Sequence, residues 1–538
     1  MAKGIVISLV SATLLSVTPL LHVLTFAQAA SKNVLRQETR RATDESRPRG
    51  SSPHPAPGQQ RPALAQAQGS QLEESRPLQH PNSKLPLTLE QSIELALQRN
   101  LRLQIATLSR DAVAYEVPRA KALFHPTVGS SFLASGEKLR PELAPAVDKN
   151  TQSVTAFISQ LVPTGATVTV SNDLTREEIL HETPPRTFES AVTVSVVQPL
   201  LRGGWRTVTT RPIRDAEFGV RIEEARLRAE ILRIVAQAKS TYYTAILAEK
   251  IITITEEAIQ RDQTLIETSQ ALFQAGLVTK RDIFSAGIIL AKDQARLAKA
   301  QADLAVAKNA LLDVLGIPIA TEVDLLDKDL GFQPIPLEPE LARWIAAAVS
   351  NRPEVLEVEE RLGQSELNIR VASNTTLPQL DFVASYGKLH KALTFRRSFE
   401  LRGDTWSAGL VFSVPIGNVA ARSALTRAEI EQKRLQQGLV QLKRQIELDV
   451  RTAVIKLRRS VERMRVLSVG IEQVQGKLEV AQGRFALGEA SNLDITDAQQ
   501  DLLEAQTDLL TATADYNIGL AELEASIAGP ITSSGATP

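Results

Sequence analysis

Apolar side chains recur at helical spacing over most of the chain. In the longest stretch, from Leu435 to Phe485, they return every three or four residues with a mean period of about 3.6, the value for a straight α-helix. A helix of about 70 residues is about 100 Å long, which is too long for a globular core. The pattern predicts long helices over about 212–275 and 418–487, and shorter helices near 88–122, 280–315, 340–374 and 491–527.

Two kinds of local signal set the ends of the shorter helices. Thr88 is followed by Gln91, the spacing of a capping box in which each side chain satisfies the backbone amide of the other residue. Pro126 and Pro378 are expected to end the helices that precede the strands, because proline lacks the amide that a helix interior needs. Pro353 falls inside another predicted helix, so that helix either kinks or restarts there.

Past each of these terminal prolines the apolar period changes from helical to two. Val192, Val194 and Val196 alternate with smaller or polar residues, which is the pattern of a sheet with one apolar face. Such alternation fits both an ordinary half-buried sheet and the wall of a membrane β-barrel. The predicted strands lie near 127–135, 152–162, 166–175 and 188–198, with a tight turn at 163–166, and near 379–387 and 405–414.

One motif occurs twice. Phe273, Gly276, Thr279, Asp282, Ile283 and Ala286 recur, with every spacing preserved, as Phe485, Gly488, Ser491, Asp494, Ile495 and Ala498. A second echo sets Asn100 and Pro126 against Asn351 and Pro378, at a somewhat larger offset. These offsets are too long for a solenoid repeat, so each repeat is a domain-sized unit. The difference between the two offsets means that the first repeat holds about 40 extra residues.

The repeated motif predicts a tight turn between two helices. Gly276 and Gly488 can take the left-handed conformation that ends a helix. Thr279 and Ser491 then stand where a side chain caps the following helix.

The aspartates of the motif have two interpretations. Asp282 and Asp494 stand at the third position of the following helices, where they are capping residues worth about 1 kcal/mol each. Asp497 lies one turn beyond Asp494 on the same helix face. Two carboxylates on one face could form a charged constriction if several chains met there, or simply an acidic patch in a solvated helix.

Composition excludes several classes of protein. The formal net charge is zero, so the chain lacks the basic footprint of a nucleic-acid-binding protein. It has no cysteine, so we expect no disulfide, no thiolate chemistry and no lipidated N-terminal cysteine. With 27 Gly, 27 Pro and 4% aromatic residues, the sequence favours a long helical protein over several compact folds.

The segment 1–30 is predicted to be an export signal. Lys3 supplies the positive charge, residues 4–24 are largely apolar, and Ala27 to Ala29 offers a small-x-small cleavage site. An uncleaved membrane anchor is the alternative. The predicted division is a signal (1–30), a disordered Pro/Gln/Arg-rich leader (31–84), a first repeat (85–316), a connector (317–339), a second repeat (340–528) and a tail (529–538).

Motifs for catalysis or metal binding are missing from the sequence. Its six histidines are scattered without the i, i+4 spacing of a helical metal site. It contains neither a phosphate-binding glycine loop with its Lys and Ser or Thr nor a Gly-x-Ser-x-Gly nucleophile turn. We therefore expect no enzyme activity, no cofactor and no bound metal.

Taken together, these motifs resemble those of the TolC-like outer-membrane efflux proteins, from about residue 87 to residue 528. The resemblance is carried by both turn motifs and by two further segments, Leu87–Ile93 with Ala96, Leu97 and Asn100, and Gln198–Gly204. It implies a mainly α-helical, internally duplicated chain with a β-barrel part. In a homotrimer, long helical hairpins would form a periplasmic α-barrel continuous with a transmembrane β-barrel.

The resemblance also implies a function and partners. The chain would be a passive outer-membrane exit duct of a tripartite efflux or type I secretion machine, surrounded by outer-membrane lipid and supplied by an inner-membrane pump or ABC exporter. A periplasmic adaptor protein would bind the tip turns and open them. The implied tip and adaptor positions are Gly276, Leu277, Thr279, Asp282, Gly488 and Ser491, and the implied gate residues are Asp494 and Asp497.

This chain departs from the family pattern in two places. A basic residue that helps some members lock the closed tip is replaced by Ala490. Four plus two predicted strands exceed the usual two plus two, so a trimer would have 18 strands if the extra hairpin joins the wall and 12 if it does not. A periplasmic adaptor or a coiled-coil scaffold without its own pore remains the alternative function.

Overall fold

The computed structural model describes residues 85–140, 147–180, 183–184, 186–276, 278–327, 330–332, 340–486 and 489–530. The predicted export signal and leader lie outside the described residues, as do residues 531–538 of the predicted tail.

The first predicted helix is divided into three. They are α3 (Leu89–Arg99), α4 (Leu101–Ala114) and α5 (Glu116–Ala122). The predicted capping box of Thr88 and Gln91 is present at the start of α3. The first break falls at Asn100, whose side chain accepts hydrogen bonds from the next helix and donates one to the carbonyl of Val314 at 2.7 Å.

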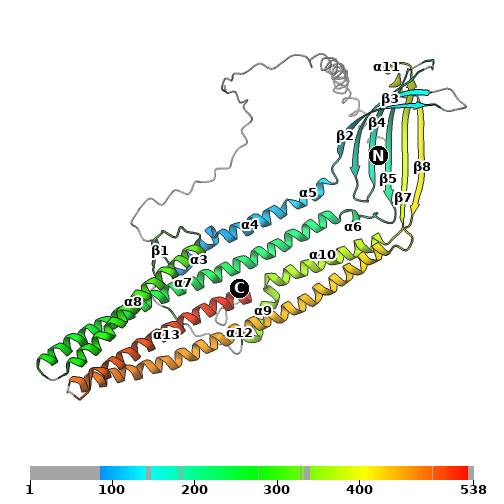
Figure 1. The fold of residues 1–538 in the computed structure, drawn as a ribbon. Helices are drawn as coiled ribbons and strands as arrows, with labels where there is room; N and C mark the ends of the chain where they lie inside the picture. Colours follow the sequence, from blue (N-terminus) through cyan, green and yellow to red (C-terminus); the bar gives the residue numbers. More distant parts are fainter. Residues whose placement is uncertain are drawn as a thin grey trace, which may run out of the picture. The chain divides into compact units, whose positions relative to one another are not determined.

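Two long helical hairpins dominate the structure (Figure 1). Hairpin 1 consists of α7 (Arg211–Gln274) and α8 (Lys280–Leu315), and hairpin 2 of α12 (Val419–Ala486) and α13 (Asn492–Ile527). These bounds agree with the long and short helices predicted from the apolar period. Within the described residues, no helix combines the length and apolar character needed to cross a membrane.

Shorter helices complete the second repeat and the connections to the strands. Pro353 restarts the helix instead of kinking it, because α9 (Leu341–Asn351) ends before it and α10 (Pro353–Thr375) begins with it. Proline is favoured at a first helical position, where its missing amide costs nothing. Two short helices, α6 (Arg206–Thr209) and α11 (Phe395–Ser398), lie next to strands.

Six long antiparallel strands form one sheet. They are β2 (Thr127–Leu139), β3 (Val147–Leu161), β4 (Thr167–Leu180), β5 (Arg186–Pro199), β7 (Gln379–Ala392) and β8 (Gly403–Ser413), hydrogen-bonded in that order. The predicted turn at 163–166 joins β3 to β4 and places Gly165 at a φ of 94°. The extra hairpin of the first repeat is therefore part of the sheet, and the strands are longer than their alternation predicted.

A small parallel pair of strands was not predicted. β1 (Leu85–Leu87) pairs with β6 (Val323–Leu325). The hydroxyl of Tyr242 on α7 donates to the carbonyl of Leu87 and to the carboxylate of Asp327. Such short strands give no periodicity signal, so the chain pattern alone did not reveal this pair.

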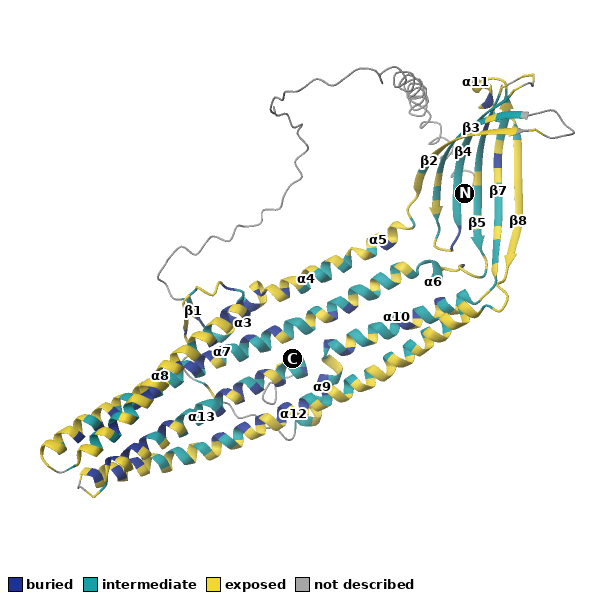
Figure 2. Cartoon of the chain, viewed as in Figure 1, coloured by how far each residue is buried: buried dark blue, intermediate teal, exposed yellow. Residues whose placement is uncertain are grey.

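The buried core is divided among three clusters along the helices. One surrounds Tyr242 in the first repeat, one surrounds Tyr516 in the second, and one lies beside the hairpin turns and includes Leu265 and Phe485. Figure 2 shows β8 and one side of α12 as exposed in the single chain. Exposed apolar residues on these elements, such as Trp406 at 78%, leave the outer edges of the chain without a partner.

Candidate functional site at the turns of the two hairpins

The turn of hairpin 1 has the capping geometry that its sequence predicts. Gly276 has a φ of 79°, which glycine alone adopts without strain. The Asp282 carboxylate accepts hydrogen bonds from the backbone amide of Thr279 at 2.9 Å and from its hydroxyl at 2.6 Å. Leu277 lies outside the described residues.

The turn of hairpin 2 repeats this arrangement. The Asp494 carboxylate accepts from the amide of Ser491 at 2.8 Å and from its hydroxyl at 3.0 Å. The hydrogen bond from the Ser491 amide is the main cause that lowers the pKa of Asp494 below its ordinary value, and the hydrogen bond from the Ser491 hydroxyl is the second. Gly488 lies outside the described residues.

The two candidate gate residues differ in how they are used. Asp494 caps a helix, whereas Asp497 is exposed and its carboxylate makes no hydrogen bond within the described part of the chain. Capping alone therefore explains why an aspartate stands at position 494. Asp497 is the one of the two that local structure does not explain.

Asn492 joins the two turns, and sequence reasoning missed it. It is fully buried at the first position of α13. Its side-chain amide donates to the Ser269 hydroxyl of α7 at 2.5 Å and to the Asp282 carbonyl of α8 at 3.0 Å. The equivalent position of the motif in hairpin 1 is the exposed Lys280, so the difference between the two copies was the signal available in the sequence.

A polar layer lies further along the contact between α7 and α13. Asp262 is one heptad before Ser269, and Gln499 is one heptad after Asn492, so the antiparallel helices bring the two into register. Asp262 is 2% exposed and Gln499 is 6% exposed. Asp262 Oδ2 and Gln499 Oε1 have no hydrogen-bond partner within the described residues.

Asp262 also faces a second carboxyl group across hairpin 1. Burial and, to a lesser extent, the neighbouring charge of Asp293 on α8 together raise the pKa of Asp262 to about 7, while Arg261 opposes the shift. Burial likewise raises the pKa of Asp293, against the lowering effect of Arg296. Two like charges this close in a buried site favour a shared proton.

Hairpin 2 has exposed ion pairs between its helices instead. Lys477 pairs with Asp501 at 2.6 Å, and Lys456 with Glu522 at 3.4 Å. Between these pairs, Arg463 reaches Asp508 at 2.9 Å and Asp515 at 3.9 Å. The acidic residues of α13 recur every seven positions and the basic residues of α12 follow the same interval except at Gly470, so they form a ladder along one face.

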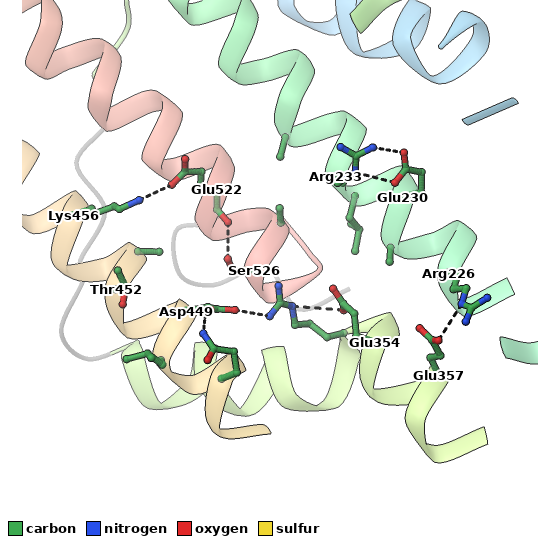
Figure 3. A pocket seen from close by; sticks show the side chains of 18 residues that line it. Arg226, Glu230, Arg233, Glu354, Glu357, Asp449, Thr452, Lys456, Glu522 and Ser526 are labelled. Atoms are coloured by element: carbon green, nitrogen blue, oxygen red, sulfur yellow. Dashed lines mark hydrogen bonds and ion pairs between the residues drawn. The ribbon is translucent and has the colours of Figure 1, made fainter. Parts of the chain in front are cut away.

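A cavity of about 640 Å³ lies where the two repeats meet. Figure 3 shows side chains from α7 of the first repeat opposite α10, α12 and α13 of the second. Its charges pair with one another, as Arg226 does with Glu357 at 3.0 Å and Arg352 with Asp449 at 3.1 Å. The cavity thus has little excess charge for an ionic ligand, and the pair of Arg226 with Glu357 links the two repeats.

The described acidic side chains near the turns do not form a metal site. In the part of the chain that the structure describes, no group of three or more His, Asp or Glu residues is placed to hold a metal ion. The acidic residues of the turns are exposed or used as caps. What this arrangement provides is a pair of turns joined by Asn492, with the exposed Asp497 on the adjoining helix free of a capping role.

The sequence matches the family described as outer membrane efflux protein over residues 92–317 and 344–529. The chain is 27% identical over 291 residues to the probable outer membrane lipoprotein SilC of Salmonella typhimurium, covering 52% of this chain and 59% of that protein. It is 24% identical over 327 residues to the outer membrane efflux protein BepC of Brucella suis, covering 59% of this chain and 68% of that protein.

Solved structures share the fold. The outer-membrane channel OprN superposes with a TM-score of 0.63 at 18% identity, over 82% of this chain and 90% of that chain. At this identity the likeness concerns the arrangement of helices and strands. The two matched segments of the family follow the two repeats, so the duplication is part of the shared architecture.

Proposed function

Because the chain belongs to the outer membrane efflux protein family, we propose that it is a passive exit duct serving a tripartite efflux or type I secretion machine. As a member of this family it is an outer-membrane protein with a large periplasmic helical part. Its match covers 59% of SilC, so the machine and cargo are part of the proposal.

Assembly as a homotrimer is the second part of the proposal. Exposed apolar residues at the edges of the single chain, such as Ile105 on α4 and Val466 on α12, favour contacts with further copies. Three copies would join their hairpins into a periplasmic α-barrel and their sheets into a membrane β-barrel. The repeats would be residues 85–316 and 340–528, joined by the connector 317–339.

The hairpin turns are the proposed gate and adaptor contact. The observation that carries this proposal is the buried Asn492 bridge, which makes the two turns one unit at the end of the helices opposite the sheet. An adaptor that binds Thr279, Asp282 or Ser491 on the exposed side of the turns would therefore move both hairpins. In a closed trimer, three copies of Asp497 would ring the opening and bind cations.

The proposed duct has no catalytic role. Its energy would come from an inner-membrane pump or ABC exporter, transmitted by a periplasmic adaptor. Exposed acidic residues on α13 would affect which ions pass, whereas the inner-membrane partner would choose the cargo.

Single-channel conductance in a planar bilayer tests the proposal. The purified protein is expected to give a small, steady conductance that multivalent cations block from the side of the hairpin turns. Asp497→Asn should raise the half-blocking cation concentration about tenfold, because three charges near the cation are lost. It leaves the cap of Asp494 intact, unlike a change at Asp494 itself.

Two controls separate a gate charge from a weakened turn. Asp282→Ala removes the equivalent cap in hairpin 1 without touching the proposed ring, so it should leave cation block unchanged. Ser285 is the counterpart of Asp497 in the first copy of the motif, and Ser285→Asn should also have no effect. Equal block in Asp497→Asn and the unmodified protein would refute the gate role, and a lack of any conductance would favour a scaffold without a pore.

A further inference from the structure

The six-stranded sheet has two unpaired edges within the described chain. β2 stands at one end of the hydrogen-bonding order and β8 at the other. Both carry large exposed apolar residues, among them Phe132 at 67% and Phe412 at 63%. Long open edges of this kind invite pairing with another strand, so a stable protein must pair or cover them.

The sheet also has two distinct faces. One row of directly paired residues is apolar across all six strands, and it consists of Val128, Ile158, Val170, Val194, Tyr386 and Trp406. The adjacent row on the opposite face carries only hydroxyl side chains, and it consists of Thr127, Ser159, Thr169, Ser195, Ser385 and Ser407. An apolar outer face and a hydroxyl-lined inner face suit a wall between lipid and water.

The hydroxyl row shows how far each strand is shifted along its own length relative to the others. It begins at Thr127, the first residue of β2 at the helix side of the sheet. In β5 it passes through Ser195, four residues from the helix-side end at Pro199. In β8 it reaches Ser407, six residues from the helix-side end at Ser413. The strands therefore shift steadily in one direction across the chain.

This stagger has the value that a closed barrel needs. Six residues correspond to about 20 Å along a strand, and five strand spacings to about 24 Å, so the strands tilt by about 40°. Three copies with a stagger of six residues each give a shear of about 18 for 18 strands, and hence a mean tilt of about 35°. Outer-membrane barrels tilt by about 35–45°.

The two edges also fit each other at this stagger. If Ser413 of one copy lies opposite Thr127 of the next, all eleven residues of β8 pair with residues 127–137. On the outer face Phe132 then meets Ala408 and Trp406 meets Ala134, whereas Phe412 meets Val128. A shift of one residue would turn the apolar residues of β8 inward, so the two faces restrict the alternatives.

We propose that β8 of one copy pairs with β2 of a second copy, Ser407 opposite Leu133, and that three copies so close an 18-stranded barrel. This inference rests on the proposed outer-membrane duct. The extra hairpin β3–β4 lies in the middle of the sheet, so it forms part of the wall. An 18-stranded wall is about 36 Å across between backbones, against about 24 Å for 12 strands, so the membrane pore admits bulkier cargo.

Cysteine cross-linking tests the strand order, since the sequence has no cysteine of its own. Directly opposed residues of antiparallel strands lie within the reach of a disulfide. Ser407→Cys with Leu133→Cys, and the neighbouring pair Ala408→Cys with Phe132→Cys, cover both kinds of opposed position. Mild oxidation of the membrane-inserted protein is expected to link chains into dimers and trimers, and Ser407→Cys with Thr127→Cys, about 20 Å apart, should not.

A second set of pairs decides between 18 and 12 strands. Thr169→Cys with Ser195→Cys should link within one chain if the hairpin β3–β4 is in the wall. Thr127→Cys with Ser195→Cys should link only if β2 lies directly beside β5 and the hairpin is outside it. Efficient linking of the latter pair in conducting protein would overturn the 18-stranded wall while leaving the duct intact. Failure of all pairs between chains, together with no conductance, would instead overturn the proposed duct.

Discussion

The two hairpins have nearly the same turn and very different contacts between their helices. In both, an Asp at the third helical position accepts hydrogen bonds from the amide and the hydroxyl of the capping residue. Behind the turn, hairpin 1 buries the Asp262 and Asp293 carboxyl pair, whereas hairpin 2 displays exposed ion pairs such as Lys477 with Asp501. The duplicated sequence has thus kept its turns and changed its helix contacts.

The differences fall at equivalent positions of the two repeats, aligned on the turn motif. Asp262 of hairpin 1 corresponds to Val474 of hairpin 2, and Lys477 of hairpin 2 corresponds to the buried Leu265 of hairpin 1. Exposed ion pairs are individually weak, at about 0.2–1 kcal/mol, and salt screens them. A buried carboxyl pair responds to pH instead. The stability of hairpin 2 should therefore depend on salt concentration, and that of hairpin 1 on pH.

The largest expected effect is a pH dependence confined to hairpin 1. The pKa of Asp262 rises from an ordinary 3.8 to about 7 in the fold, so the folded hairpin holds its proton more tightly than an opened one. Its stability is therefore greatest below about pH 4 and falls as the pH rises towards 7. Hydrogen exchange should show the opening constant around Asp262 increasing by up to about tenfold per pH unit in that window, after correction for intrinsic rates.

Two comparisons check that the dependence comes from this carboxyl group. Asp262→Asn cannot ionise, so it should make the profile of hairpin 1 shallower and leave only the weaker dependence that comes from Asp293. In the unmodified protein, amides near Leu457, in the separate core cluster of the second repeat, should show no such trend. Equal pH profiles in both hairpins, or a profile that Asp262→Asn leaves unchanged, would contradict the role of the buried pair.

The second effect concerns the bridge between the hairpins. Asn492→Ala removes two hydrogen bonds from a fully buried side chain. It also leaves the buried Ser269 hydroxyl without its donor, so the change should destabilise the packing of the turns by about 1–3 kcal/mol. Limited proteolysis of residues 269–286 and 489–498, compared with global melting, measures this local loss.

Lys280 provides the matched control, because it occupies the equivalent position of hairpin 1. It is exposed, so Lys280→Ala should leave proteolysis of both turns within about a few tenths of a kcal/mol of the unmodified protein. If Lys280→Ala and Asn492→Ala had the same effect, the bridge would not distinguish the two copies of the turn.

Most of the fold could be predicted from the spacing of apolar residues and from the residues that begin and end helices. The long helices, both turns and the strand pattern depend on nearby residues, such as the apolar residues that recur at helical spacing from Leu435 to Phe485. Helix breaks were less predictable. The break at Asn100 depends on a hydrogen bond to Val314, a residue far away in the sequence, and β1 with β6 is likewise a contact between distant segments.

The candidate site was only partly predictable. Asp282 and Asp494 could be assigned as caps, because a cap is decided by its immediate neighbours in the sequence. Asn492, Asp262 and Asp293 were missed since their burial depends on which helix lies opposite. The position of the hairpin β3–β4 was also undecided, because alternation gives the faces of a strand and not its neighbours.

The smallest effect concerns a gap in the ion-pair ladder of hairpin 2. The basic positions of α12 run Lys456, Arg463, Gly470 and Lys477 at intervals of seven, so Gly470 is where a charge is missing. A side chain there meets no atom within 4 Å in the single chain. Gly470→Ala should stabilise the helix by about 1 kcal/mol through helix propensity.

Gly470→Lys should add about 0.2–1 kcal/mol more at low salt, because a lysine there lies within reach of Asp508, and lose that addition at about 1 M salt. Thermal melting of both variants at two salt concentrations isolates the charge term. Gly287 of hairpin 1 is also uncrowded, and Gly287→Lys should show no comparable salt-dependent gain over Gly287→Ala. If the advantage of lysine over alanine at position 470 persisted at high salt, it would come from packing, and the ladder would not explain the difference between the hairpins.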